Sequence, residues 1–151
     1  MKYQQEVIDW VREEIEPLLR AHYTEVAKHQ DKVKYDPNWD FYYAAEKAGM
    51  FYVFTARTDE GELVGYNCYF LNPHPHYRDR LCAMNDIFYV AKEHRGKMTG
   101  LRLLDFSEAA LSNGKGINYF FMHVKPDHDF SPMLIRCGYE LHEYIYSKVL
   151  E

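Results

Sequence analysis

The stretch N-D-I-F-Y-V-A-K-E-H-R-G-K-M-T-G-L-R-L-L, from Asn85 to Leu104, decides the fold. Its apolar run I-F-Y-V predicts the end of a central strand, and the residues after Gly100 predict a helix. Between them, Arg95 and Lys97 lie on either side of Gly96. A glycine loop at the start of a helix presents unpaired backbone N–H groups and the positive end of the helix dipole. The stretch therefore predicts an anion site, most simply for a phosphate.

On both sides of this stretch, hydrophobic periodicity predicts the other elements. Apolar residues at three- and four-residue steps predict a helix from Gln4 to Lys28, kinked or split at Pro17. A second helix, Trp39 to Lys47, is expected with Asn38 as its N-terminal cap. A first strand is scarcely visible in residues 1–3. The further predicted elements are strands at 51–57 and 63–71 joined by a hairpin turn, a proline- and histidine-rich loop at 72–80, a strand at 81–90, a helix at 99–112, a strand at 117–124, a short helix at 130–136 and a last strand at 141–150.

Length and composition limit the classes of protein. The 151 residues, 47% hydrophobic and 27% charged, are typical of a globular chain, and no repeat or linker divides them. We therefore expect one domain over residues 1–151. A net charge of −5 argues against a general nucleic-acid binder. The sequence contains no 18-residue apolar run and no signal-peptide core, so no membrane segment is expected. Three cysteines without C-x-x-C spacing fit a reduced cytoplasm.

Three kinds of phosphate ligand are commonly bound by a glycine loop at the start of a helix. A nucleotide-triphosphate P-loop is excluded, because no Gly-Lys-Ser/Thr follows the first glycine at the required spacing. A dinucleotide site would place its glycine loop after the first strand of a repeated βαβ unit, whereas this loop follows the third predicted strand. The remaining interpretation is the pyrophosphate of coenzyme A.

The quoted stretch resembles the strand-loop-helix signature of the GCN5-related N-acetyltransferases (GNAT), whose loop reads Gln/Arg-x-x-Gly-x-Gly/Ala. Arg95 matches the first position and Gly100 the last, while Met98 replaces the middle glycine. The resemblance implies an α/β fold of the α+β type. Its central sheet would be mixed, mostly antiparallel and twisted, with about six strands, flanked by helices of which two are N-terminal. Several short segments also look like a branch found in tailed phages and prophages.

The resemblance also implies a cosubstrate, acetyl-CoA, and no metal. In the family, backbone groups of the strand before the loop bind the pantetheine arm, and the loop amides hold the pyrophosphate. Carried over to this sequence, the strand contacts are Phe88, Tyr89 and Val90, and the loop contacts are Arg95, Gly96, Lys97, Met98, Thr99 and Gly100.

For catalysis, the resemblance points to a carboxylate on the same strand that takes the proton of the amine. The matching residue is Asp86, and the alternative is a structural aspartate at a strand bulge. The family's usual general acid, a tyrosine on the short helix, falls at Leu134 or Ile135, and neither is a tyrosine. The thiolate would then be protonated by water, by a tyrosine such as Tyr139 or Tyr144, or not at all.

Residues of the 72–80 loop are candidates for contacts with the acceptor. His74, His76 and Tyr77 are predicted to bind the substrate, together with Asn85 beside the candidate base. A metal site of His74 and His76 with His22 or Asp86 is the less favoured alternative. His123 is interpreted as a core histidine on a buried strand.

The predicted activity is direct transfer of an acetyl group from acetyl-CoA to a primary amine within a ternary complex. The acceptor is left open among amino acids, polyamines, aminoglycoside-like compounds, protein lysines and protein N-termini. A rival hypothesis is a binding or interaction protein on the same fold that holds coenzyme A weakly or not at all. An enzyme for longer acyl chains is a third option, and pairing of edge strands would give a homodimer.

Overall fold

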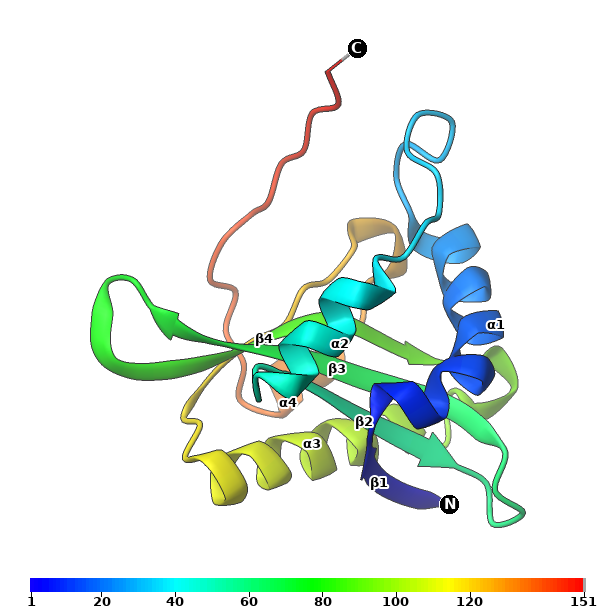
Figure 1. Cartoon of the computed structure of the whole chain (residues 1–151), viewed down its shortest axis with the longest axis horizontal. Coiled ribbons are helices and arrows are strands. Elements are labelled where there is room, and N and C mark those ends of the chain that lie inside the picture. Colours follow the sequence, from blue (N-terminus) through cyan, green and yellow to red (C-terminus); the bar gives the residue numbers. More distant parts are fainter. Residues whose placement is uncertain (151) are drawn as a thin grey trace.

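A five-stranded mixed sheet forms the centre of the molecule (Figure 1). The computed structural model describes residues 1–150. The strands lie in the order β1-β2-β3-β4-β5, with antiparallel pairs from β1 to β4 and a parallel pair of β4 with β5. The bounds are Lys2–Glu6 (β1), Phe51–Arg57 (β2), Leu63–His74 (β3), Tyr77–Val90 (β4) and Tyr119–Phe121 (β5). The structure is therefore of the predicted α+β type, with five strands where about six were expected.

Helices cover both faces of the sheet. Helix α1 (Ile8–Val26) and helix α2 (Trp39–Lys47) come between β1 and β2 in the chain and pack with one face of the sheet into a core around Phe51 and Tyr66. Helix α3 (Thr99–Lys115) packs on the other face around Phe54 and Tyr69. The short helix α4 (Ser131–Arg136) follows β5. Figure 1 shows α1 and α2 on one side of the strands and α3 on the other.

The N-terminal prediction was wrong in its boundaries. Residues 2–6 form β1, paired with β2, and α1 begins only at Ile8. The helix also continues through Pro17 as one element, so the split into two helices, one of the two alternatives expected there, does not occur. Proline removes one backbone N–H and crowds the carbonyl four residues earlier, that of Glu13. Glu13 and Pro17 both lie on the exposed side of α1, where water can bind that carbonyl.

The predictions for α2 and for the following hairpin are confirmed. The Asn38 side chain accepts a hydrogen bond from the Phe41 amide (3.1 Å), as an N-terminal cap does. Gly49, at φ 70°, follows the helix end. The turn between β2 and β3 is closed by a hydrogen bond from the Thr58 amide to the Glu62 carbonyl (2.9 Å).

The predicted loop at 72–80 is instead the end of a long two-stranded arm. Strands β3 and β4 continue past the sheet and are joined through Pro75 and His76 alone. Figure 1 shows the arm projecting to the left of the body. Proline in the sequence argued against strands here. However, β2 pairs with β3 only as far as Phe70, so one edge of β3 is free at Pro73 and the missing N–H disrupts no ladder.

The C-terminal predictions are confirmed only in part. Strand β5 is shorter than the predicted 117–124, and α3 extends to Lys115 with Gly116 at φ 69° as its C-cap. Helix α4 is present. The predicted last strand is absent, because residues 141–150 have no regular secondary structure and, as Figure 1 shows, leave the body of the molecule.

Candidate functional site

A β-bulge in β4 sets the position of the candidate base. Cys68 of β3 pairs with Ile87 and Tyr69 pairs with Asn85, so Asp86 is an extra residue without a partner. A bulge interrupts the alternation of side chains between the two faces. As a result, Asp86 and Ile87 both reach the face covered by α1 and α2.

The Asp86 carboxylate is half-buried and hydrogen-bonded. Its Oδ2 accepts a hydrogen bond from the Tyr42 hydroxyl of α2 (3.0 Å). Burial raises the pKa of Asp86, while the bond from Tyr42 and the charge of His123 act in the opposite direction. A carboxylate whose pKa is raised above its usual value is a stronger base, which suits the acceptance of a proton from an amine.

Next to Asp86 the sheet opens. Strands β4 and β5 pair only at residues 82–84 with 119–121, and β4 continues to Val90 without a strand on that side. The predicted pantetheine contacts lie along this unpaired part. Phe88 packs on Phe130 with ring centroids 5.3 Å apart, whereas Tyr89 turns to the other face and stacks on His22 of α1 at 4.8 Å. The free backbone edge there is open to an extended ligand arm.

The loop before α3 presents a row of backbone donors. Its backbone is left-handed at Gly96 (φ 74°) and at Met98 (φ 60°). The first helical hydrogen bond runs from the Arg102 amide to the Met98 carbonyl (2.9 Å). Within residues 1–150, no hydrogen bond is donated by the backbone N–H groups of residues 96–101. Such a concave series at a helix N-terminus is a site for an anion that needs no cationic side chain.

The side chain of Arg95 has another partner. Its guanidinium forms a two-point ion pair with Glu25 of α1 (2.7 and 3.1 Å) and donates to the Val90 carbonyl (2.7 Å). Arg95 thus ties the loop to α1. Among the other predicted loop residues, Lys97 is exposed and the Thr99 residue is buried. A β-carbon on Gly100 would lie 3.4 Å from Phe88 Cζ.

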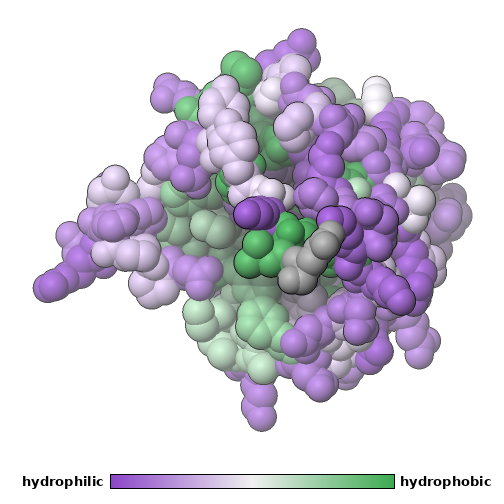
Figure 2. Space-filling model, turned by 90° about the horizontal axis from the view of Figure 1, so that it is seen from above, coloured by the Kyte–Doolittle hydropathy of each residue, from purple (hydrophilic) through white to green (hydrophobic). Residues whose placement is uncertain are grey.

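The predicted substrate residues are not brought together with Asp86. His74, His76 and Tyr77 lie at the tip of the arm. Asp86 comes nine positions after Tyr77 along β4, which corresponds to about 30 Å of extended strand. Figure 2 shows this arm, again at the left, with a largely hydrophilic surface. His74 therefore also lies far from His22 and Asp86, and no cluster of three metal-ligating side chains is found in residues 1–150.

Asn85 points away from Asp86. It is 2% exposed and donates to Asn67 Oδ1 (3.0 Å), which belongs to a buried network with Ser107 of α3. The bulge explains this placement, since Asn85 and Asp86 face opposite sides of the sheet. His123, interpreted as a core histidine, is exposed instead, because β5 ends at Phe121.

The sequence alone did not indicate Tyr42 or His123 as site residues, and it indicated His22 only as a ligand of the less favoured metal site. Burial lowers the pKa of His22 to about 4, and its Nδ1 lies 2.8 Å from the Tyr66 hydroxyl, so the ring is neutral at pH 7. Tyr42 and His22 form part of apolar helix faces, and no local signal separates them from core residues. For His123, only the end of the strand at Phe121 would have revealed its exposure.

The two positions expected for a general acid, Leu134 and Ile135, lie in α4 and carry aliphatic side chains that cannot donate a proton. Leu134 is buried in α4, and Ile135 is 65% exposed. Of the two alternative tyrosines, Tyr139 donates its hydroxyl proton to Glu108 of α3, and Tyr144 is 74% exposed in the C-terminal segment. Neither contacts Asp86 or Tyr42.

A pocket of about 320 Å³ lies between α1, the α1–α2 loop, α2 and the sheet. Its lining includes His22, Tyr42 and Ile87. Asp86 itself is not part of the lining, but its carboxylate is hydrogen-bonded to the Tyr42 hydroxyl. One molecule bound there and another along the open side of β4 would approach each other near Asp86. The arrangement can therefore bring two reactants and a base together.

Comparisons with known proteins agree with this arrangement. Residues 6–139 match the Acetyltransferase (GNAT) family. No protein of curated function matches the chain at a significant level.

Among solved structures, a ribosomal-protein-alanine N-acetyltransferase from Brucella melitensis biovar Abortus 2308 is 19% identical, with a TM-score of 0.69 and 100% and 99% of the two chains covered. An aminoglycoside acetyltransferase, meta-AAC0020, from an uncultured soil metagenomic sample is 15% identical (TM-score 0.75; 99% and 96% covered). A putative acetyl transferase from Pyrococcus furiosus is 18% identical (TM-score 0.70; 99% and 100% covered).

At these identities the structures show the fold alone, and none of the comparisons supports the expected phage or prophage branch. No helix within residues 1–150 has the length and apolarity needed to cross a membrane. The match over residues 6–139 shows the family: the chain belongs to the GNAT acetyltransferases.

Proposed function

We propose that this chain is an acetyl-CoA-dependent N-acetyltransferase that acts on a primary amine by direct transfer. The observation that carries the proposal is the row of unpaired amides at residues 96–101, which continues the unpaired side of β4. These amides and the positive end of α3 would hold the pyrophosphate, and the backbone of Phe88, Tyr89 and Val90 would hold the pantetheine arm. The residues present thus fit the cosubstrate without help from a cationic side chain.

In the proposed reaction the amine nitrogen attacks the thioester carbonyl carbon. A C–N bond forms, the C–S bond breaks, and the products are an acetylated amine and the thiol of coenzyme A. Asp86 accepts the proton that the nitrogen loses, and Tyr42 positions the Asp86 carboxylate through its hydroxyl. Water supplies the proton of the departing thiolate, because Leu134 and Ile135 cannot and Tyr139 is bound to Glu108.

The placement of the predicted substrate residues narrows their roles. His74, His76 and Tyr77 would contact only an acceptor that extends along the arm, such as a protein carrying the amine. Asn85 would act indirectly, by fixing the strand next to the bulge. We further propose that residues 1–151 work as one domain in the cytoplasm, where the three free cysteines fit a reducing environment.

Calorimetric titration with acetyl-CoA, coenzyme A and ADP tests the proposal. We expect binding of acetyl-CoA and coenzyme A and much weaker binding of ADP, which lacks the pantetheine arm. Gly100→Asp should reduce the affinity for acetyl-CoA at least tenfold, because the new carboxylate would repel the pyrophosphate. Gly114→Asp, at the other end of α3 where a side chain meets nothing within 4 Å, is the matched control and should bind normally.

Stability measurements distinguish a loss of acetyl-CoA binding from a loss of folding in these two variants. An acidic side chain favours the N-terminal end of a helix and disfavours the C-terminal end. Gly100→Asp should therefore unfold no more easily than Gly114→Asp while binding acetyl-CoA less well. If wild-type protein shows no heat with acetyl-CoA and no thiol release with any amine, the rival hypothesis of a non-catalytic binding protein is favoured.

A further inference from the structure

The pocket beside Tyr42 has the character of an apolar cage. Most of its lining is aliphatic or aromatic, contributed by α1, α2 and the sheet, as with Leu19, Trp39 and Phe51. At about 320 Å³ it lies at the small end of the range for ligand sites, about 300–1,000 Å³. It can hold one ring or a short chain, and not a chain of linked sugars.

Three polar side chains of the pocket are already hydrogen-bonded within the protein, whereas the buried Tyr35 hydroxyl has no hydrogen-bond partner within residues 1–150. The Tyr42 hydroxyl donates to Asp86, the Tyr23 hydroxyl donates to the Val33 carbonyl, and His22 Nδ1 is hydrogen-bonded to Tyr66. A sugar or a polyamine has many polar groups that would lose water on entering and find few partners. An apolar body loses nothing in this way and gains from leaving water.

The charges at the pocket also oppose a polycation. Lys34 and Lys125 line it against a single acidic side chain, that of Asp36, and His22 is neutral at pH 7. The Asp86 carboxylate, one hydrogen bond beyond Tyr42, is needed for one amine only. A second or third ammonium group would meet lysines.

Resting on the proposed function, we infer that the acceptor is a monoamine with an apolar or aromatic body, and not a polyamine or an aminoglycoside. The amine lies at the Tyr42–Asp86 end and the body lies in the pocket. Under this inference, the pocket on the α1–α2 side of the sheet determines which acceptor binds. The exposed side chains of Lys34 and Lys125 help to exclude polycations from it.

The test compares four acceptors by thiol release from acetyl-CoA: 2-phenylethylamine, hexylamine, spermidine and kanamycin. We expect kcat/KM for the first two to exceed that for the last two at least tenfold. In the variant Lys34→Glu/Lys125→Glu, the ratio of 2-phenylethylamine to spermidine should fall at least fivefold at low salt, where surface charges are least screened. A preference of the wild type for spermidine or kanamycin overturns the inference.

A pocket-filling variant tests the location. Ala27→Trp, at the C-cap of α1, should lower kcat/KM for 2-phenylethylamine at least tenfold and leave the affinity for acetyl-CoA unchanged. Ala21→Trp, on the exposed side of the same helix, is the matched control. If Ala27→Trp behaves like Ala21→Trp, the acceptor does not use this pocket.

Binding separates this inference from the proposed function. If no amine is acetylated, titration of 2-phenylethylamine and spermidine into the protein with coenzyme A still tests which class of amine the pocket binds. Tighter binding of 2-phenylethylamine supports the apolar pocket although the transferase proposal fails. Tighter binding of spermidine, or no binding of either, overturns the inference.

Discussion

The carboxylate of Asp86 is held where its charge is costly for folding and useful for chemistry. It owes this position to a single extra residue in β4. Because burial raises its pKa, the folded state binds the proton of Asp86 more tightly than the unfolded chain does. The stability that follows from the proton is present at low pH and is lost as the pH rises through the pKa of the folded state. The deprotonation that removes this stability also produces the carboxylate that acts as the base.

Asp86→Asn separates these two effects. An amide keeps an acceptor for the Tyr42 hydroxyl but carries no charge, so the melting temperature should rise at pH 8 and be unchanged near pH 3. The variant should lose about 10²- to 10⁴-fold in kcat, the usual contribution of a general base. Affinity for acetyl-CoA, measured by calorimetry, is the control and should not change. Wild-type kcat in this variant would remove Asp86 from the mechanism.

Tyr42→Phe tests the positioning of that base. The Tyr42 hydroxyl donates a hydrogen bond that favours the charged carboxylate, so its removal should raise the pKa of Asp86 further. The acid side of the pH profile of kcat should therefore move to higher pH, with much of the activity regained at high pH. A uniform loss of activity at every pH would indicate that Tyr42 has only a packing role.

At the scale of elements, the loop before α3 includes a residue that does not suit its conformation. Met98 lies at φ 60° and ψ 7°, in the left-handed region, where a side chain costs about 1–2 kcal/mol relative to glycine. Its side chain is 55% exposed and so gains little from burial. The left-handed backbone at Met98 is nevertheless part of the loop conformation that leaves the neighbouring backbone N–H groups without an internal partner within residues 1–150.

Met98→Gly should therefore raise the free energy of unfolding by up to about 1 kcal/mol, the strain relieved less the extra chain entropy of glycine. Urea unfolding measures this. Gly96→Ala is the opposite change at φ 74°, in open space, and should cost about 1 kcal/mol. Equal stability of the two variants would mean that the loop relaxes to another conformation.

Local signals predicted the strand-loop-helix of residues 85–104 and the capped helix α2, since apolar runs, Asn38 and the glycines act through near neighbours. Elements that depend on distant partners were not predicted in this way. β1 is a strand because β2 is beside it, and the arm extends through Pro73 because β2 is no longer beside it.

The site follows the same division. The loop amides could be predicted from a motif. In contrast, Asp86 and Asn85 point to opposite faces of the sheet because of the β-bulge, and the position of this bulge is defined only by the pairing of β3 with β4. Tyr42 and His22 come to Asp86 and Tyr89 through packing of whole helices on the sheet, and no spacing in the sequence records that contact.

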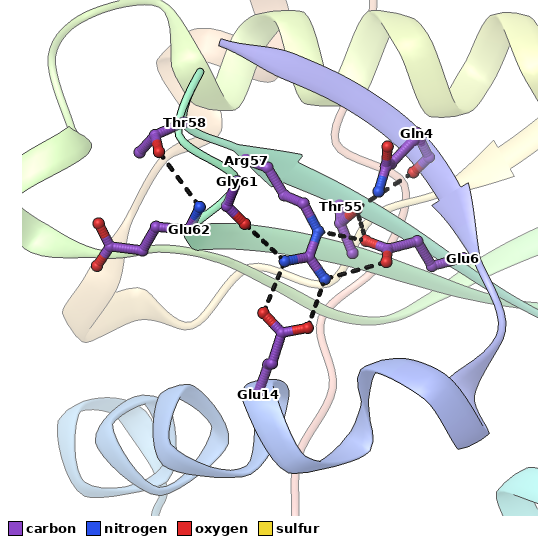
Figure 3. A network of polar contacts seen from close by, with 8 residues as sticks. All are labelled: Gln4, Glu6, Glu14, Thr55, Arg57, Thr58, Gly61 and Glu62. Atoms are coloured by element: carbon purple, nitrogen blue, oxygen red, sulfur yellow. Dashed lines mark hydrogen bonds and ion pairs between the residues drawn. The ribbon is translucent and has the colours of Figure 1, made fainter.

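At the scale of the whole molecule, one half-buried guanidinium, that of Arg57, joins three elements at one end of the sheet. Arg57 of β2 is bound at two points by Glu6 of β1 (2.9 and 3.0 Å) and at two points by Glu14 of α1 (2.7 and 2.9 Å), as Figure 3 shows. It also donates to the Gly61 carbonyl in the β2–β3 turn (2.8 Å). This network fixes α1, and with it one wall of the pocket.

The carboxylates of the network respond to Arg57. Burial alone would raise the pKa of Glu6, but hydrogen bonds from Arg57 and Thr55 outweigh it and the pKa is lowered. The bond from Arg57 likewise lowers the pKa of Glu14. A lowered pKa in the folded state adds stability above the unfolded pKa of about 4.5, and that stability is lost as the pH falls through the folded values.

Arg57→Ala should therefore lower the free energy of unfolding at pH 7 by about 2–3 kcal/mol, because Glu6 keeps a charge that is only 15% exposed and has no counter-ion. The deficit should shrink as the pH falls below about 4.5, where Glu6 and Glu14 gain protons in the unfolded chain. Lys28→Ala removes an ion pair with Asp127 in which the two side chains are 52% and 63% exposed, and it should leave the free energy of unfolding nearly unchanged, because water screens exposed charges. Urea unfolding of both variants at pH 7 and pH 4 measures these differences. A similar small cost for both, or a cost for Arg57→Ala that does not depend on pH, would mean that packing of α1 on the sheet holds the pocket wall without the ion pairs.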